Sequence, residues 1–172
     1  MYQELEHFRP GILGALMDEY EYTGMQITEL LAGISEEQFT YIADPDTKDP
    51  DCHSIQTIMK HVIGSGYGYA NYLRTAFWGE IKEIERPKFN AENIEGVRSS
   101  FAEMMRYTIQ TLHEKWTMTD EEIQKISIRT RWNVVYDPEQ LLEHAIVHIL
   151  RHRRQMNRFL LIMEAKGIYR KL

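Results

Sequence analysis

The sequence has only one cysteine, Cys52, among its 172 residues. A disulfide within the chain is therefore excluded, and a reducing cytoplasm is the expected compartment. The opening residues, MYQELEHFRPG, carry acidic side chains where a secretory signal needs basic and then apolar residues. No run approaches the roughly 20 apolar residues of a transmembrane helix. We therefore expect a cytoplasmic protein with no membrane association.

The chain also lacks an excess of basic residues. Its 20 lysines and arginines stand against 26 acidic residues, which gives a formal net charge of -6. Nucleic-acid binding needs a basic face, so no nucleic-acid partner is expected. The composition, 43% hydrophobic and 27% charged, is that of an ordinary globular protein. At this length we predict one domain spanning residues 1–172.

Apolar residues recur with helical spacing in four long segments. These run from Gly11 to Gly33, from Ser54 to Gly79, from Asn93 to Trp116, and from Asp137 to Lys166. The last start is the best defined, because Asp137, Pro138 and Gln140 supply an N-cap, a first-turn proline and a capping-box acceptor. We predict an all-α fold, a four-helix bundle in which the apolar stripes of the four helices face one another.

The segments between these helices are shorter. Ser35 with Gln38 matches a capping box that opens a short helical turn, and Pro45 and Pro50 make residues 43–53 a non-helical loop. Residues 121–137, EEIQKISIRTRWNVVYD, alternate partly and are rich in Ile, Val and Thr. This pattern leaves two alternatives open, a short hairpin or irregular structure.

The last predicted helix contains three histidines, His144, His148 and His152, at intervals of four residues. At about 100° per residue, these side chains lie on one ridge of the helix. The centre of the apolar face is marked by Ala145, Met156 and Met163. His148 and His152 therefore point toward the core more than His144 does.

Two imidazoles four residues apart can bind one metal ion, and a third ligand must then come from another helix. The best candidate is His61, which shares a stripe with Ile58, Ser65 and Tyr69 on the second helix. We therefore predict a divalent-metal site between the second and fourth helices. Three histidine ligands leave a coordination position open, which is typical of a catalytic site. Water or a thiolate could take that position, and the residues do not distinguish the two.

Three glycines, Gly64, Gly66 and Gly68, follow His61 within the second helix. Each glycine inside a helix costs about 1 kcal/mol relative to alanine, so a compensating role is expected. Small residues here either let a neighbouring helix approach closely or leave room for a substrate beside the metal. We favour the second role.

The stretch from His144 to Gln155, HAIVHILRHRRQ, together with His61, resembles the DinB-like superfamily of bacterial four-helix-bundle metalloproteins. The resemblance spans nearly the whole chain. By position, His61, His148 and His152 match the metal ligands of that family. His144 matches an upstream histidine that is usually not a ligand, and Gln155 matches a final glutamine of the family motif.

Two positions depart from the family pattern. Arg151 stands where the family has the first histidine of an HH pair, and Arg154 stands where it has glycine. Neither change replaces a ligand, but two long cations now flank the site. The resemblance implies a zinc, nickel or similar divalent ion and a homodimer. Characterised relatives include transferases and isomerases that use low-molecular-weight thiols such as bacillithiol, mycothiol or glutathione.

The resemblance and the histidine pattern together predict a metal-dependent enzyme with a small-molecule substrate, either a thiol-dependent S-transferase or a hydrolase. Gln155, Arg151 and Tyr69 are the candidate residues for binding the thiol or the substrate. The alternative is a non-enzymatic metal-binding or stress-associated helical protein, in which the metal only stabilises the bundle.

Several of these side chains also have a plain structural explanation. Arg151 belongs to a basic run that a solvated helix face explains as well as an anion site does. Tyr69 is an aromatic residue at helical spacing, which is typical of a core. Cys52 precedes a helix start, and an inert loop thiol is favoured there over a reactive one. The histidines predicted to be ordinary surface residues are His7, His53 and His113.

Two other types of metal site have little support. A ferritin-like di-iron site needs two Glu-x-x-His motifs, and only Glu4 with His7 has that spacing. The sequence contains no HExxH motif, so a zincin-type protease is not expected.

Overall fold

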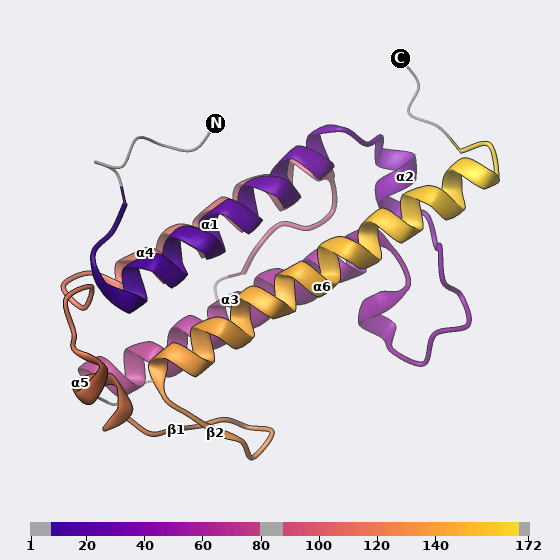
Figure 1. Cartoon of the computed structure of the whole chain (residues 1–172). Coiled ribbons are helices and arrows are strands. Elements are labelled where there is room, and N and C mark those ends of the chain that lie inside the picture. The colour runs from indigo at the N-terminus through magenta and orange to yellow at the C-terminus, as the bar shows by residue number, and fades with distance from the viewer. Residues whose placement is uncertain (1–7, 80–87, 169–172) are drawn as a thin grey trace.

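A computed structural model describes residues 8–79 and 88–168 of the chain (Figure 1). Most of these residues are helical, as the periodicity predicted. The elements are α1 Gly11–Ala32, α2 Glu36–Thr40, the 3-10 turn η2 Pro50–Cys52, α3 Ile55–Trp78, α4 Ile94–Leu112, α5 Asp120–Gln124, β1 Ile128–Arg129, β2 Val135–Tyr136 and α6 Pro138–Ala165. None of the described helices combines the length and the apolar character that a membrane span requires.

The helix starts are set by capping residues. The Ser54 hydroxyl accepts a hydrogen bond from the backbone N–H of Thr57, and the Asp137 carboxylate accepts one from that of Gln140. Each cap satisfies a backbone donor that the first helical turn leaves free. Both starts agree with the sequence prediction. The end of α4 does not, because the helix stops at Leu112 and Glu114 takes a positive φ of 66°, so Trp116 lies beyond it.

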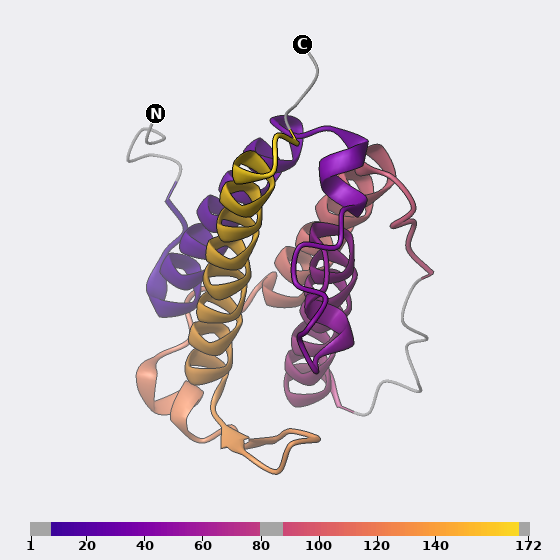
Figure 2. The same ribbon diagram turned by 90° about the vertical axis from the view of Figure 1, so that its right-hand side faces the viewer.

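The four long helices lie alongside one another. α1 packs against α6 and α4, and α3 packs against α4 and α6. Figure 2 shows the pair α1 and α6 beside the pair α3 and α4. The shared core is built from fully buried side chains of all four helices, among them Met17, Ile27, Val62, Met104, Ile149 and Phe159. The seam between α3 and α6 matters most for function, because the predicted ligands lie on these two helices.

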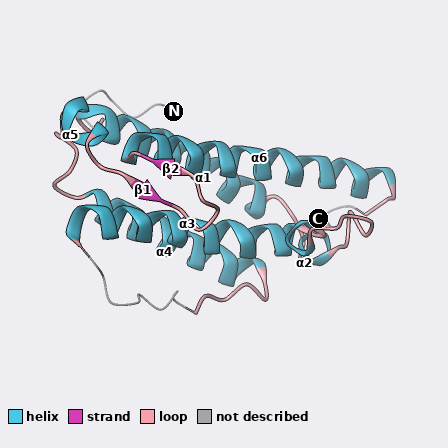
Figure 3. Ribbon diagram, turned by 90° about the horizontal axis from the view of Figure 1, so that it is seen from below, coloured by secondary structure: helices cyan, strands magenta, loops and turns pink. Residues whose placement is uncertain are grey.

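The connection from α4 to α6 contains a short hairpin, one of the two alternatives that the sequence left open. β1 and β2 are antiparallel, with Ile128 opposite Tyr136 and Arg129 opposite Val135. A turn closes the hairpin, in which the backbone N–H of Asn133 donates to the carbonyl of Thr130 over 3.0 Å. β1 contacts α3 and β2 contacts α6, so the hairpin lies beside the seam between these helices (Figure 3).

The small residues of α3 serve both of the roles considered for them. A Cβ added to Gly66 would lie 2.8 Å from Cε and 2.9 Å from Cγ of Met104, so Gly66 lets a core side chain of α4 approach the α3 backbone. This is the close approach that we had not favoured. Ser65 and Gly68, in contrast, line a cavity beside the histidines, as the favoured role requires.

Candidate metal centre

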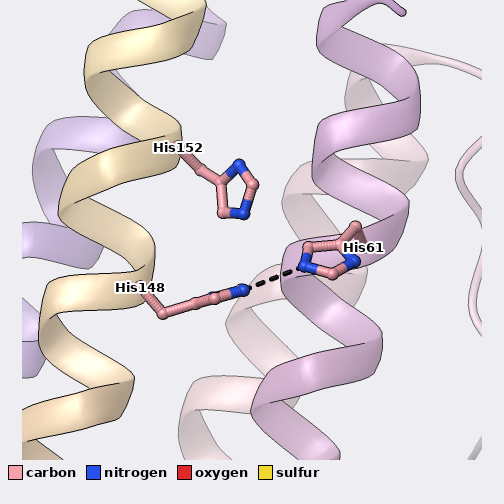
Figure 4. Close-up of side chains that lie close together, drawn as sticks. All are labelled: His61, His148 and His152. Carbon is pink, nitrogen blue, oxygen red and sulfur yellow. Dashed lines mark hydrogen bonds between the residues drawn. The ribbon is translucent and has the colours of Figure 1, made fainter. Parts of the chain in front are cut away.

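Three histidine rings meet across the seam between α3 and α6. His61 comes from α3, and His148 and His152 come from successive turns of α6 (Figure 4). One ring nitrogen from each residue lies within 4.8 Å of the others. The Nε2 atoms of His61 and His148 are 2.9 Å apart. The structure therefore brings together the three side chains that the sequence singled out.

The local folding of each helix explains this convergence. The Ser54 cap places His61 in the second turn of α3, on the face that also carries buried Ile58. On α6, the buried residues Ala145 and Ile149 flank the same ridge as the histidines and turn it toward α3. Side chains four residues apart on a helix stand above one another. Two imidazoles from α6 therefore meet one from α3.

Asp51 orients the His61 ring. Its Oδ2 atom lies 3.0 Å from Nδ1 of His61, on the side of the ring away from the other histidines. A carboxylate that accepts the Nδ1 proton leaves Nε2 as the free lone pair, which is a common arrangement behind a metal-ligating histidine. Asp51 belongs to η2, within the loop 43–53. The sequence analysis missed it, because no periodic pattern fixes where a loop carboxylate lies.

Gln155 orients the His152 ring in a similar way. Its Oε1 atom lies 3.2 Å from Nδ1 of His152 and 3.7 Å from Sγ of Cys52. The glutamine that the family motif singled out thus contacts a predicted ligand. The Cys52 sulfur also lies 3.4 Å from Oδ2 of Asp49. Burial raises the pKa of the Cys52 thiol, so the cysteine stays protonated at neutral pH, which agrees with the inert role favoured for it.

Burial keeps two of the imidazoles neutral. Desolvation, followed by the neighbouring His152 and His61, lowers the pKa of His148 to about 3. Desolvation also lowers the pKa of His152. The Nδ1 atom of His148 is buried without a hydrogen-bond partner. At neutral pH these rings therefore offer unprotonated nitrogens, the form that binds metal ions.

The donor set fits a divalent ion of intermediate softness. Three imidazole nitrogens suit zinc or nickel, and the two outer acceptors fix which ring nitrogen is available on His61 and His152. Within residues 8–79 and 88–168, this is the one group of three or more His, Cys, Asp or Glu side chains placed to hold an ion. The Glu4 and His7 pair of the di-iron alternative lies outside the described residues.

A cavity of about 470 Å³ opens beside His61 and His148. Tyr69 and Tyr72 of α3 and Trp132 of the hairpin turn form part of its wall. Tyr69 is 7% exposed, and burial raises its pKa to about 12, so it keeps its phenol proton at neutral pH. Trp132 was not foreseen, because its place over the cavity depends on how the hairpin folds back.

His144 does not join the three-histidine cluster. Its Nδ1 atom lies 3.3 Å from the Tyr136 hydroxyl, and its ring stacks on Trp132 with 5.7 Å between centroids. Burial lowers its pKa. This placement agrees with the expectation that the first histidine of the α6 ridge is not a ligand, and it gives His144 a role in the cavity wall instead.

The remaining candidate residues are not part of the three-histidine cluster. Arg151 is exposed on α6, yet its charge helps to lower the pKa of His148 and His152. Among the histidines expected at the surface, His113 is exposed, whereas His53 is half-buried with Nδ1 3.0 Å from the Asp44 carbonyl oxygen. The surface prediction for His53 is therefore wrong in part, because the loop folds back over it. His7 lies outside the described residues.

The chain was compared with models of known protein families. Residues 1–162 match the family model described as DinB family. The matched range covers every described helix and strand except the last residues of α6. It contains the three clustered histidines. A comparison with curated proteins finds no significant match.

Proposed function

The chain belongs to the DinB family, and from this premise and the three-histidine cluster we propose that it is a metal-dependent enzyme. The proposed activity is that of a thiol-dependent S-transferase or a hydrolase acting on a small molecule. The observation that carries the proposal is the convergence of three ring nitrogens within 4.8 Å, beside a cavity large enough for a substrate. In a purely structural site, protein ligands would fill all the coordination positions of the ion.

In this proposal each residue has a defined task. His61, His148 and His152 would hold the ion, and Asp51 and Gln155 keep two of these rings in the binding orientation. A bound zinc or nickel ion would supply Lewis-acid activation of a thiol or of water. The cavity wall is partly aromatic, and Tyr69 retains its phenol proton throughout the neutral range.

The family premise extends to the architecture. We assign the four long helices α1, α3, α4 and α6 to a four-helix bundle, with residues 1–172 forming one domain. We also propose that the protein is a cytoplasmic homodimer. The pairwise packing of these helices and their common core support the bundle assignment.

A second candidate function is a non-enzymatic role in which the ion only stabilises the helices. The position of the cluster between α3 and α6 supports this reading, since a shared ion would tie the two helices together. The adjoining cavity favours the enzyme, because a stabilising ion has no need of an open space beside it.

Elemental analysis and a turnover screen separate the two functions. Protein purified without an affinity tag is expected to carry about one zinc or nickel ion per chain. Stripping the ion should abolish consumption of an electrophile in the presence of a small thiol, or of a hydrolysable ester, and adding it back should restore the activity. Metal binding with no metal-dependent turnover, together with a large loss of melting temperature on stripping, would favour the stabilising role.

Asp51→Asn is expected to weaken metal binding by about 10- to 100-fold, the usual effect of losing an outer hydrogen-bond partner of a ligand. The amide can present its N–H groups to Nδ1 of His61 and so no longer selects the tautomer with a free Nε2. Competition with a chromophoric chelator measures the change. The control is Asp46→Asn, which makes the same change of charge at an exposed position of the same loop. Its metal affinity should stay within about threefold of the wild type. Equal affinities in both variants would refute the role of Asp51.

A further inference from the structure

The cavity beside the cluster is bounded by flat rings. Trp132 forms part of its wall, with its ring nearly perpendicular to that of Tyr72 at 5.9 Å and to that of Tyr69 at 6.3 Å. The Trp132 ring also stacks on His144 at 5.7 Å with an interplanar angle of 23°. Such surfaces bind planar, unsaturated groups better than saturated ones, because ring faces and edges attract one another electrostatically. The wall therefore favours a flat ligand body.

The charge of the cavity has one sign. Among the described residues that line it, Arg131 carries the one permanent charge, and no lining side chain is a carboxylate. Arg131 also takes part in no ion pair within the described chain. An arginine that faces a cavity without an acidic partner is available for an anionic group of a ligand.

The hairpin turn holds Arg131 and Trp132 in place. These two residues occupy the centre of the turn between Thr130 and Asn133. The backbone N–H of Arg131 donates to the Tyr72 hydroxyl over 2.7 Å, which ties the turn to α3. The Thr130 hydroxyl donates to the carbonyl of Val134 over 2.8 Å and braces the other side of the turn. Arg131 and Trp132, both exposed to solvent, therefore line the cavity from one anchored loop.

From these features we propose that the cavity binds a small organic carboxylate with a planar, unsaturated body, held by the rings of Trp132, Tyr72 and Tyr69 and by the guanidinium of Arg131. A carboxylate is favoured over a phosphate, since one permanent positive charge balances one negative charge. As the substrate class of the enzyme, this inference rests on the proposed function. The binding itself does not require the metal.

Benzoate is the probe, and calorimetric titration of the metal-stripped protein is the measurement. Benzoate should bind at least tenfold more tightly than benzamide, which lacks the charge, and than cyclohexanecarboxylate, which lacks the flat ring. Arg131→Gln should weaken benzoate binding by at least tenfold and remove the preference over benzamide. Trp132→Leu should remove the preference over cyclohexanecarboxylate. Arg154→Gln, the same charge change at an exposed position outside the cavity, should have no effect.

Two results would overturn the inference. One is equal benzoate binding by the wild type and Arg131→Gln. The other is benzoate binding that needs the metal and ignores Arg131, which would place the carboxylate on the ion. Circular dichroism and metal content of each variant establish that the fold and the cluster are intact, and Arg131→Lys should retain part of the affinity. Failure of the metal-content experiment would sink the proposed function while leaving this binding result standing, so the two failures are distinguishable.

Discussion

Replacing His148 with alanine should weaken binding of zinc or nickel by more than about 100-fold, beyond the 10- to 100-fold effect of losing an outer partner. His148 supplies one of three clustered nitrogens, and its Nε2 atom is the one that faces His61 at 2.9 Å. The helical content should hardly change. Nδ1 of His148 makes no hydrogen bond, so its loss leaves no partner unpaired. Chelator competition and circular dichroism provide the two measurements.

His144→Ala is the matched control for this experiment. It removes an imidazole one turn earlier on α6, from a ring that bonds Tyr136 and stacks on Trp132 outside the cluster. Its metal affinity should stay within about threefold of the wild type. If the two variants bind metal equally well, the ion is not held by the cluster, and the proposal of a three-histidine centre fails with it.

Acid should destabilise the metal-free protein in part through His148. Its pKa is about 3 in the folded chain and 6.5 when unperturbed, so between these values the unfolded state binds the extra proton. The contribution of His148 to the free energy of unfolding is therefore fully present above pH 6.5 and is lost as the pH falls toward 3. At pH 4.5 the loss should be ~2 kcal/mol, allowing for the part of the ring that water reaches.

His148→Gln removes this titration. Urea unfolding is measured at pH 7.5 and 4.5 with a chelator present. Between the two pH values, the free energy of unfolding of the wild type should fall by ~2 kcal/mol more than that of the variant. His113→Gln, which removes an exposed imidazole instead, should lose as much as the wild type. If His148→Gln is as acid-sensitive as the wild type, burial of this ring does not set the acid response.

Periodic segments made the core of the site predictable from the sequence. The i, i+4 spacing on α6 and the apolar stripe on α3 fix the direction in which His61, His148 and His152 point once the two helices pack together. The residues that complete the site were not predictable in this way. Asp51 and Trp132 lie in a loop and a turn, and their positions depend on hydrogen bonds such as that between Arg131 and Tyr72.

The same distinction explains the smaller errors. The apolar spacing of α4 continues to Trp116, but Glu114 adopts a left-handed backbone conformation that ends the helix earlier. Periodicity gives no sign of such a reversal. The role of Gly66 was also misjudged, because a sequence does not show that Met104 of a distant helix lies over it.

The position of the cluster has a consequence for how the molecule comes apart. His61 and His148 are 87 residues apart in the chain and belong to different helix pairs, α3 with α4 and α6 with α1. A metal ion bound by both residues would thus act as a removable cross-link over a long chain loop. It would add ~4 kcal/mol to the free energy of unfolding when the free ion is at about 1,000 times its dissociation constant. Without the metal, we expect local opening to begin where α3 meets α6. Faster proteolysis and faster amide hydrogen exchange in these helices would detect it.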